Sequence, residues 1–220
     1  MTRQLKDSLY EQVARIGKAF SSPKRLELLE LLAQSEKTVE ILARESGIDV
    51  RLASAHLRVL RNASLVHARK AGKHVFYRLA GEDVAGLIVN LRHVAGEHLL
   101  ELKMALERIV GNPGKLAAYR RDEFMERARN GEVVVIDVRP RHEYEEGHLP
   151  FARSMPLEEI VERLSELPKD REIVAYCRGP FCLLSDQAVA LLEKQGYRVS
   201  KISDGVAEWK AAGLTVENRA

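Results

Sequence analysis

The chain has 220 residues, of which 45% are hydrophobic and 30% are charged, and its formal net charge is +3. This composition is typical of folded globular proteins, and the length suffices for two domains of about 100 residues each. No apolar run approaches the roughly 20 residues of a membrane span, and residues 1–7 lack the apolar core of a secretory signal, so we expect a cytoplasmic protein without a membrane partner.

In chain order, the first half predicts an amphipathic helix over 5–20, a helix that begins at Ser22-Pro-Lys-Arg, short helices over 38–46 and 50–62, a β-hairpin over 65–78, and one long helix over 82–110. Ser22 is suited to the N-cap position and Pro23 to the first helical position. Gly47 lies in the tight turn between the two short helices. A turn at Ala71-Gly72 divides the alternating pattern of the hairpin.

Two short helices joined by a turn and followed by a basic hairpin predict a winged helix-turn-helix, so this domain is expected to be mainly α with a β-hairpin wing. In the second short helix, Leu52, Leu57 and Leu60 are expected to face the core. The candidate DNA-binding residues project from that helix or lie at the wing tip: Arg51, Ser54, His56, Arg58, Arg69, Lys70, Lys73 and His74. Such side chains can contact base edges or phosphates.

Charge separates this half from the rest of the chain. Residues 1–116 carry a net charge of +6 and residues 117–220 a net charge of −3. Residues 51–78 hold seven Lys or Arg and no Asp or Glu. The alternative is a solvated basic surface, but a window without acidic residues over a helix-turn-helix and a hairpin favours DNA as the partner.

The first half resembles the ArsR family of winged-helix repressors, in Ser22-Pro-Lys-Arg-Leu-Glu-Leu-Leu, in Ser54-Ala-His-Leu-Arg-Val-Leu-Arg and in the wing that ends Phe76-Tyr-Arg-Leu. The resemblance implies a homodimer, joined through the first and last helices, on a palindromic operator in double-stranded DNA. Many members sense metals. Here residues 36–42 contain no thiol, and His93, Glu97 and Glu101 do not fit the family's metal-ligand spacing, so we expect no metal and no cofactor.

The second half begins after Gly111-Asn-Pro-Gly, which cannot continue a helix and predicts a linker over 111–116 between domains 1–110 and 117–220. The apolar runs 133–136 and 173–176 are typical of strands buried on both faces. Expected helices alternate with them, over 122–130, 157–164, 185–195 and 206–212. This alternation predicts an α/β fold with a parallel sheet.

Three segments of this half resemble rhodanese domains: Val135-Ile-Asp-Val-Arg-Pro with Gly147-His-Leu-Pro-Phe-Ala-Arg, then Tyr176-Cys-Arg-Gly, then Asp204-Gly-Val-Ala-Glu-Trp. The resemblance implies a parallel five-stranded sheet flanked by helices. It also implies a loop cysteine that takes a sulfane sulfur from a donor and passes it to a nucleophile. By the same resemblance, Asp137 and Arg139 organise the surroundings of the active site, mainly in a structural role.

Cys177 follows a buried strand directly, so it lies at the carboxyl end of the sheet, where α/β folds bind ligands. Loop amides and the start of the next helix would lower the pKa of its thiol. Arg178 could bind an anionic sulfur donor such as thiosulfate or polysulfide. The remaining loop residues are Gly179, Pro180, Phe181 and Leu183. These features predict thiosulfate or persulfide sulfurtransferase activity, with Cys177 as the nucleophile.

Cys182 lies on the same loop, where it is either a thiol that resolves the Cys177 persulfide or a small apolar residue that faces the sheet. The two halves together predict a sequence-specific DNA-binding repressor whose rhodanese domain forms a persulfide on Cys177 and senses or transfers sulfane sulfur. Two alternatives stay open. One is a sulfurtransferase in which the winged helix serves mainly for dimerisation, and the other is a repressor whose rhodanese domain binds a ligand without turnover.

Overall fold

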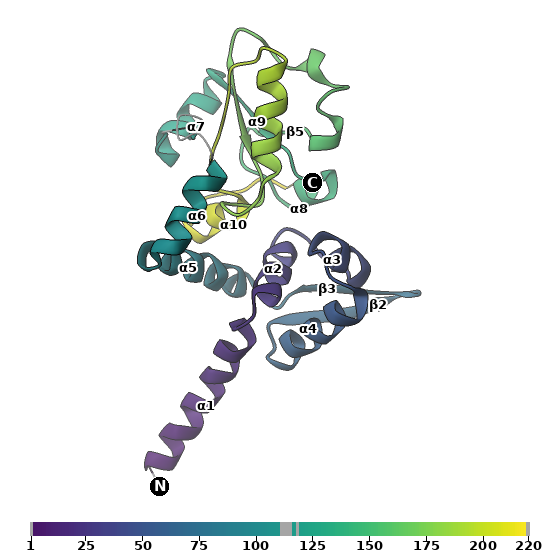
Figure 1. Ribbon diagram of the computed structural model, residues 1–220, viewed down its shortest axis with the longest axis vertical. Coiled ribbons are helices and arrows are strands. Elements are labelled where there is room, and N and C mark those ends of the chain that lie inside the picture. The colour runs from purple at the N-terminus through teal and green to yellow at the C-terminus, as the bar shows by residue number, and fades with distance from the viewer. Residues whose placement is uncertain (1, 111–115, 118, 219–220) are drawn as a thin grey trace. The chain divides into compact units, whose positions relative to one another are not determined.

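The computed structural model describes residues 2–110, 116–117 and 119–218 (Figure 1). The chain divides into two compact units, Met1–Ile88 and Val89–Ala220. This division falls inside a helix, whereas the linker expected over 111–116 lies mostly outside the described residues and stays a prediction. Among the described helices, none is both long enough and apolar enough to cross a bilayer.

The first unit contains α1 (Thr2–Phe20), α2 (Pro23–Leu32), β1 (Lys37–Thr38), α3 (Val39–Glu45), α4 (Val50–Asn62), β2 (Val66–Ala71) and β3 (His74–Leu79). β3 pairs antiparallel with both β1 and β2. Thr38 caps α3 by accepting a hydrogen bond from the Ile41 amide, and Asp49 caps α4 by accepting one from the Leu52 amide. The predicted winged helix-turn-helix is confirmed.

Leucines from α2, α3 and α4 form most of the core of this unit. In α4, Ala53, Leu57 and Leu60 are fully buried, whereas Leu52 is 42% exposed. The expectation that Leu52 faces the core is therefore wrong. Residues at i, i+4 and i+7 share one face of a helix, and Ala53 rather than Leu52 has that spacing to Leu57 and Leu60.

The single long helix expected over 82–110 is also wrong, because α5 (Glu82–His98) and α6 (Leu100–Val110) are separate helices. Gly96, in the last turn of α5, weakens the helix at this point, since glycine costs a helix about 1 kcal/mol relative to alanine. Val84 and Ile88 of α5 pack into the core of the first unit. The rest of α5 belongs to the second unit.

The second unit also contains α7 (Arg121–Arg129), β4 (Val133–Asp137), α8 (Arg141–Glu146), β5 (Arg153–Ser154), β6 (Glu172–Tyr176), α9 (Leu184–Lys194), β7 (Val199–Lys201) and α10 (Val206–Ala211). Its parallel sheet has the order β5-β4-β6-β7. The expectation of five strands is wrong for the described residues, because Leu116 adds only a single parallel bridge to Lys201. The helix expected over 157–164 is replaced by two short 3₁₀ turns, Leu157–Glu159 and Leu164–Glu166.

Alternation along the strands assigns side chains to the two faces of this sheet. On β6, Ile173 and Ala175 pack with α9, and Cys177 continues this series. Val174 and Tyr176 pack on the opposite face with Phe124 of α7 and Trp209 of α10. Because successive strand residues point to opposite faces, the thiol of Cys177 lies on the α9 side of the sheet.

Candidate active site and nucleic-acid interface

Cys177 is the first residue after β6, and a short loop connects it to α9. The Cys182 amide donates to the Gly179 carbonyl oxygen at 3.1 Å, which closes a turn inside this loop. Gly179 has a φ of 131°, a conformation that favours glycine. A Cβ atom on Gly205 would lie 2.6 Å from the carbonyl carbon of Arg178, so glycine there lets a neighbouring loop approach the active-site backbone.

The sulfur of Cys177 lies 3.2 Å from Ser185 Oγ and 3.4 Å from the Cys182 carbonyl oxygen. A hydrogen bond from the Cys182 thiol is the largest of the effects that lower the pKa of Cys177, to about 7. Burial opposes this shift, and the Ser185 hydroxyl and the amides of Ser185 and Gly179 add to it. The same hydrogen bond and burial raise the pKa of Cys182 well above its usual range. Near neutral pH this arrangement stabilises a thiolate at Cys177 and a thiol at Cys182.

Arg178 forms a bidentate ion pair with Glu143 of α8. Its Nε lies 3.0 Å from Glu143 Oε2 and its Nη2 lies 2.6 Å from Oε1. Glu143 is completely buried, and this guanidinium compensates its charge. The geometry supports a role for Arg178 in holding the loop on α8, and its predicted contact with an anionic donor stays a prediction.

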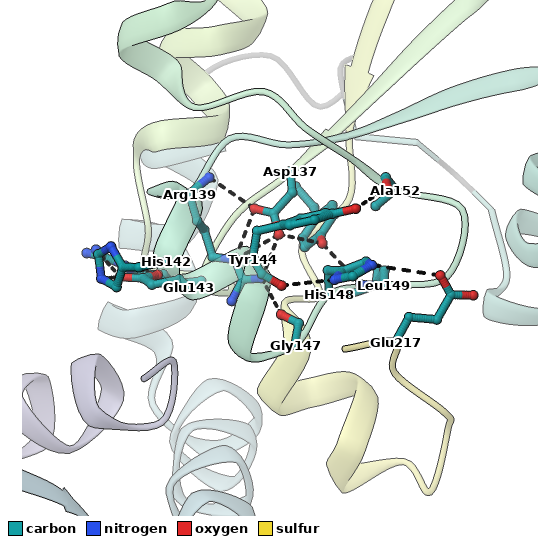
Figure 2. Close-up of polar contacts among 12 residues, drawn as sticks. Asp137, Arg139, His142, Glu143, Tyr144, Gly147, His148, Leu149, Ala152 and Glu217 are labelled. Carbon is teal, nitrogen blue, oxygen red and sulfur yellow. Dashed lines mark hydrogen bonds and ion pairs between the residues drawn. The ribbon is translucent and has the colours of Figure 1, made fainter. Parts of the chain in front are cut away.

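Asp137 and Arg139 form a completely buried ion pair at the end of β4 (Figure 2). Arg139 Nη2 lies 2.6 Å from Asp137 Oδ2 and also donates to the Gly147 carbonyl oxygen at 2.7 Å. The Tyr176 hydroxyl donates to Asp137 Oδ2 at 2.6 Å and accepts a hydrogen bond from the Leu149 amide. This network ties the ends of β4 and β6 to the segment after α8. The structural role expected for Asp137 and Arg139 stays a prediction.

The same region holds the C-terminal segment. The rings of Tyr144 and His148 stack with centroids 3.7 Å apart, as Figure 2 shows. His148 and Glu217 exchange two backbone hydrogen bonds, at 2.8 and 2.9 Å. His148 Nε2 also lies 3.8 Å from a carboxylate oxygen of Glu217. These contacts fasten the last described residues to the fold rather than to the cysteine loop.

Three polar residues near the cysteine loop were not predicted as site residues from the sequence. Ser185 was visible only as the start of the following helix. Lys201 of β7 forms a buried ion pair with Asp186 of α9. The Glu208 carboxylate accepts a hydrogen bond from the Gly205 amide and pairs with Arg92 of α5. Tertiary packing brings these residues together from distant parts of the sequence, and the only local signal among them is that Glu208 lies in the rhodanese-like segment 204–209.

Glu208 lies directly against the loop. A Cβ atom on Gly179 would be 2.9 Å from Glu208 Oε2. Burial is the largest effect on this carboxyl and raises its pKa, although Arg92 opposes the shift. Arg92 also lies over the ring of Phe181, 5.5 Å from its centroid. The loop therefore rests on a buried carboxylate whose partner is a residue of α5.

The candidate DNA-binding residues all lie on α4 or on the hairpin of β2 and β3. Arg51, Arg58, Lys70, Lys73 and His74 are exposed, whereas Ser54 and His56 are half-buried. Arg69 is exposed but pairs with Glu36 and lies over the ring of Phe76. Within the part of the chain that the structure describes, no three His, Cys, Asp or Glu side chains gather as a metal site.

Two family descriptions match the two halves of the chain. Residues 22–68 match "Bacterial regulatory protein, arsR family". Residues 120–212 match "Rhodanese-like domain". The two matches are consistent with the two folds described above and with the positions of α4 and of the cysteine loop.

Similar proteins include relatives of the whole chain and of its parts. The HTH-type transcriptional regulator Rv0324 of Mycobacterium tuberculosis is 44% identical over 98% of this chain and 94% of its own length. A sulfurtransferase of Allochromatium vinosum is 40% identical over 39% of this chain and 78% of its own length. One solved structure is a homodimeric winged helix-turn-helix DNA-binding domain, Mb0332 of Mycobacterium bovis. It is 47% identical to this chain and has a TM-score of 0.41. The match covers 44% of this chain and 89% of the solved chain.

Proposed function

The chain belongs to the ArsR family of bacterial transcriptional regulators and carries a rhodanese-like domain, and on this basis we propose that it is a DNA-binding repressor that takes up sulfane sulfur on Cys177 as a persulfide. The observation that carries the proposal is the set of donors around the Cys177 sulfur, which lowers its pKa to about 7. A thiolate is the nucleophilic form of cysteine, and here it lies at the carboxyl end of a parallel sheet.

The proposed reaction needs no cofactor. The Cys177 thiolate attacks the outer sulfur of a donor, the donor's sulfur–sulfur bond breaks, and the rest of the donor leaves as a thiolate, or as sulfite when the donor is thiosulfate. Cys177 then carries the transferred sulfur as a persulfide. The hydroxyl of Ser185 and the amides at the start of α9 stabilise negative charge on either sulfur form.

Cys182 supports a second step. The Cys177 sulfur lies 3.4 Å from the Cys182 carbonyl oxygen, and both cysteines are free thiols in this structure. Attack of the Cys182 sulfur on the inner sulfur of the persulfide would form a Cys177–Cys182 disulfide and release hydrosulfide, which carries away the thiol proton. The persulfide itself is the oxidant in this step, so sulfur loading would convert the loop between a dithiol form and a disulfide form.

The DNA-binding proposal rests on the first unit. The helix α4 and the wing present exposed basic side chains, among them Arg51, Arg58, Lys70 and Lys73. We propose that these residues contact a palindromic operator, with α4 in the major groove and the wing on phosphates. The apolar residues of α1, namely Leu5, Leu9, Tyr10 and Val13, are 61% to 68% exposed and would be covered by a second copy of the chain.

The helix α5 supports coupling between the two functions. Val84 and Ile88 lie in the core of the first unit, and Arg92, one turn further along the helix, pairs with Glu208 beneath Gly179. A change in the cysteine loop would alter the surroundings of the Glu208 carboxylate. It would thereby change the strength of the ion pair between Glu208 and Arg92. We propose that the sulfur state of the loop and the affinity for the operator influence each other through this helix.

The first test is intact mass spectrometry of the reduced full chain after treatment with thiosulfate or polysulfide. We expect a gain of about 32 mass units for each added sulfur, absent in Cys177→Ser. Cys182→Ala should keep the persulfide, whereas the unmodified chain should convert part of it to a species two protons lighter than the dithiol. No mass change with any donor would refute the persulfide proposal.

The second test compares operator binding of the reduced and sulfur-treated protein by fluorescence anisotropy. Treatment should change the affinity of the wild-type chain, and Cys177→Ser should show no change. An operator search that finds no sequence-specific site would instead favour a sulfurtransferase that uses the winged helix only for dimerisation. Equal affinities before and after persulfide formation would contradict the coupling alone.

A further inference from the structure

A cavity of about 290 Å³ opens beside the cysteine loop. Its wall includes Gly179, Pro180 and Cys182 of the loop and Ser185 of α9. Ser185 and Cys182 are the two side chains whose hydrogen bonds lower the pKa of Cys177. Two of the lining residues, Cys182 and Ser185, therefore contact the Cys177 sulfur, so the cavity lies next to this cysteine.

The wall contains one cation. Lys201 is 94% buried and, among the described lining residues, carries the only positive charge. Its ammonium pairs with Asp186, whose second carboxylate oxygen is buried and has no hydrogen-bond partner within the described residues. An ammonium has three hydrogens, so this single carboxylate contact leaves donors for a ligand. Arg178, the other cation of the loop, is instead paired with the buried Glu143.

The rest of the wall is mostly apolar and includes Leu106, Leu116 and Ile202. Such a surface favours ligands with an apolar body, because each buried methylene contributes about 0.8 kcal/mol. It disfavours thiosulfate, a dianion whose three oxygens would lose strong hydration with few donors to replace it. Asp186 adds to this discrimination, since it already neutralises the charge of Lys201 and would repel a second negative charge.

We propose that this cavity binds small organic persulfides that have an apolar body, in preference to thiosulfate. The inference rests on the proposed function and names the donor for it. The Cys177 thiolate attacks the outer sulfur of the protonated persulfide, the donor's sulfur–sulfur bond breaks, and the alkyl thiolate leaves while it accepts a hydrogen bond from the Lys201 ammonium. The cavity has about ten times the ~30 Å³ of one water, which suffices for a short alkyl chain.

The test measures the rate of sulfur gain on the reduced full chain with methyl, propyl and butyl persulfide and with thiosulfate. The ratio of kcat to KM should rise about three- to fourfold for each methylene added, and thiosulfate should be the poorest donor. Leu106→Ala should flatten the dependence on chain length, whereas Leu100→Ala, an exposed leucine at the start of the same helix, should preserve it. Rates that are independent of chain length, or fastest with thiosulfate, would overturn the inference.

The role of Lys201 is tested with the double variant Lys201→Met and Asp186→Leu, which removes both charges and leaves neither buried alone. It should lower the ratio of kcat to KM for butyl persulfide about tenfold, as expected when a charge-assisted hydrogen bond to the ligand is removed. The exposed Lys194→Met is the matched control and should keep the wild-type value. Equal values for all three proteins would overturn the assignment of Lys201.

A binding measurement separates this inference from the proposed function. In Cys177→Ser, which cannot accept sulfur, calorimetry should show that butanethiol binds more tightly than methanethiol and that Leu106→Ala removes the difference. A chain that gains no sulfur from any donor would refute the persulfide proposal even if butanethiol binds in this way. Absence of butanethiol binding would overturn the cavity assignment even if persulfide forms.

Discussion

The guanidinium of Arg178 and the carboxylate of Glu143 meet through two hydrogen bonds, and the carboxylate is completely buried. The residue next to Cys177 thus takes part in an ion pair between the loop and α8. Removing one partner of a buried ion pair leaves the other charge without compensation. The consequences of such a change are therefore expected in stability first.

Arg178→Ala should lower the free energy of unfolding by about 3 kcal/mol, because Glu143 would remain charged and buried. The midpoint of urea unfolding measures the loss. Arg141→Ala is the control, since its ion pair with Glu159 is partly exposed and worth less than about 1 kcal/mol. The double variant Glu143→Gln and Arg178→Met should recover much of the loss. If Arg178→Ala unfolds like the wild type, the pair does not hold the loop.

The reactivity of Cys177 should follow a low pKa. The rate of alkylation by iodoacetamide should rise with pH around a midpoint near 7, because the thiol is held below its usual pKa and its thiolate predominates above that value. Mass spectrometry of the alkylated chain locates the label, and Cys177→Ser should abolish the fast phase. A midpoint at the usual pKa of a free cysteine would show that the donors do not stabilise the thiolate.

Cys182 should be the strongest single influence on this midpoint, since its hydrogen bond is the largest effect on the pKa of Cys177. Cys182→Ala should move the alkylation midpoint to higher pH, and Cys182→Ser, which keeps a donor, should move it less. Ser185→Ala should also raise it, by a smaller amount than Cys182→Ala. The opposite order of Ser185→Ala and Cys182→Ala would mean that the hydroxyl, rather than the second thiol, governs the nucleophile.

Tyr176→Phe should destabilise the protein by about 1 to 3 kcal/mol, because it removes the hydroxyl that joins Asp137 to the Leu149 amide in a buried network. Thermal unfolding detects this as a lower midpoint. Tyr119→Phe provides a comparison, since its hydroxyl bonds to Glu172 in a less buried place, where the Ser200 hydroxyl also donates to that carboxylate. Equal midpoints for Tyr176→Phe and wild type would show that the hydroxyl is dispensable.

The wing should contribute to DNA affinity through charge. Replacing Lys70 and Lys73 together by alanine should weaken binding to operator and to unrelated DNA by similar factors. It should also reduce the slope of log affinity against log salt by about 2, close to one for each phosphate that is no longer neutralised. Lys194→Ala in α9 is the control and should leave the slope unchanged. A weakening confined to the operator would indicate that the wing binds base edges instead.

Much of the fold could be predicted from local patterns. The turn at Gly47 and the apolar pattern that follows it placed α4 within its observed bounds, because turn signals and helical periodicity act over a few residues. The break at Leu99, the turns that replace a helix over 157–164 and the four-stranded sheet were not predicted. At these places the apolar pattern is compatible with more than one structure, and packing decides between them.

Local sequence was enough to predict the two fold classes, to single out Cys177 as the candidate nucleophile and to locate the basic surface of the first half. Each of these depends on a contiguous motif or on a local count of charges. The pairing of Arg178 with Glu143, the contact between Cys177 and Cys182 and the place of Lys201 in the cavity beside the loop became visible only in three dimensions. These relationships depend on how the loop folds back on itself and on elements far apart in the chain, which meet because burial of two apolar sheet faces brings them together.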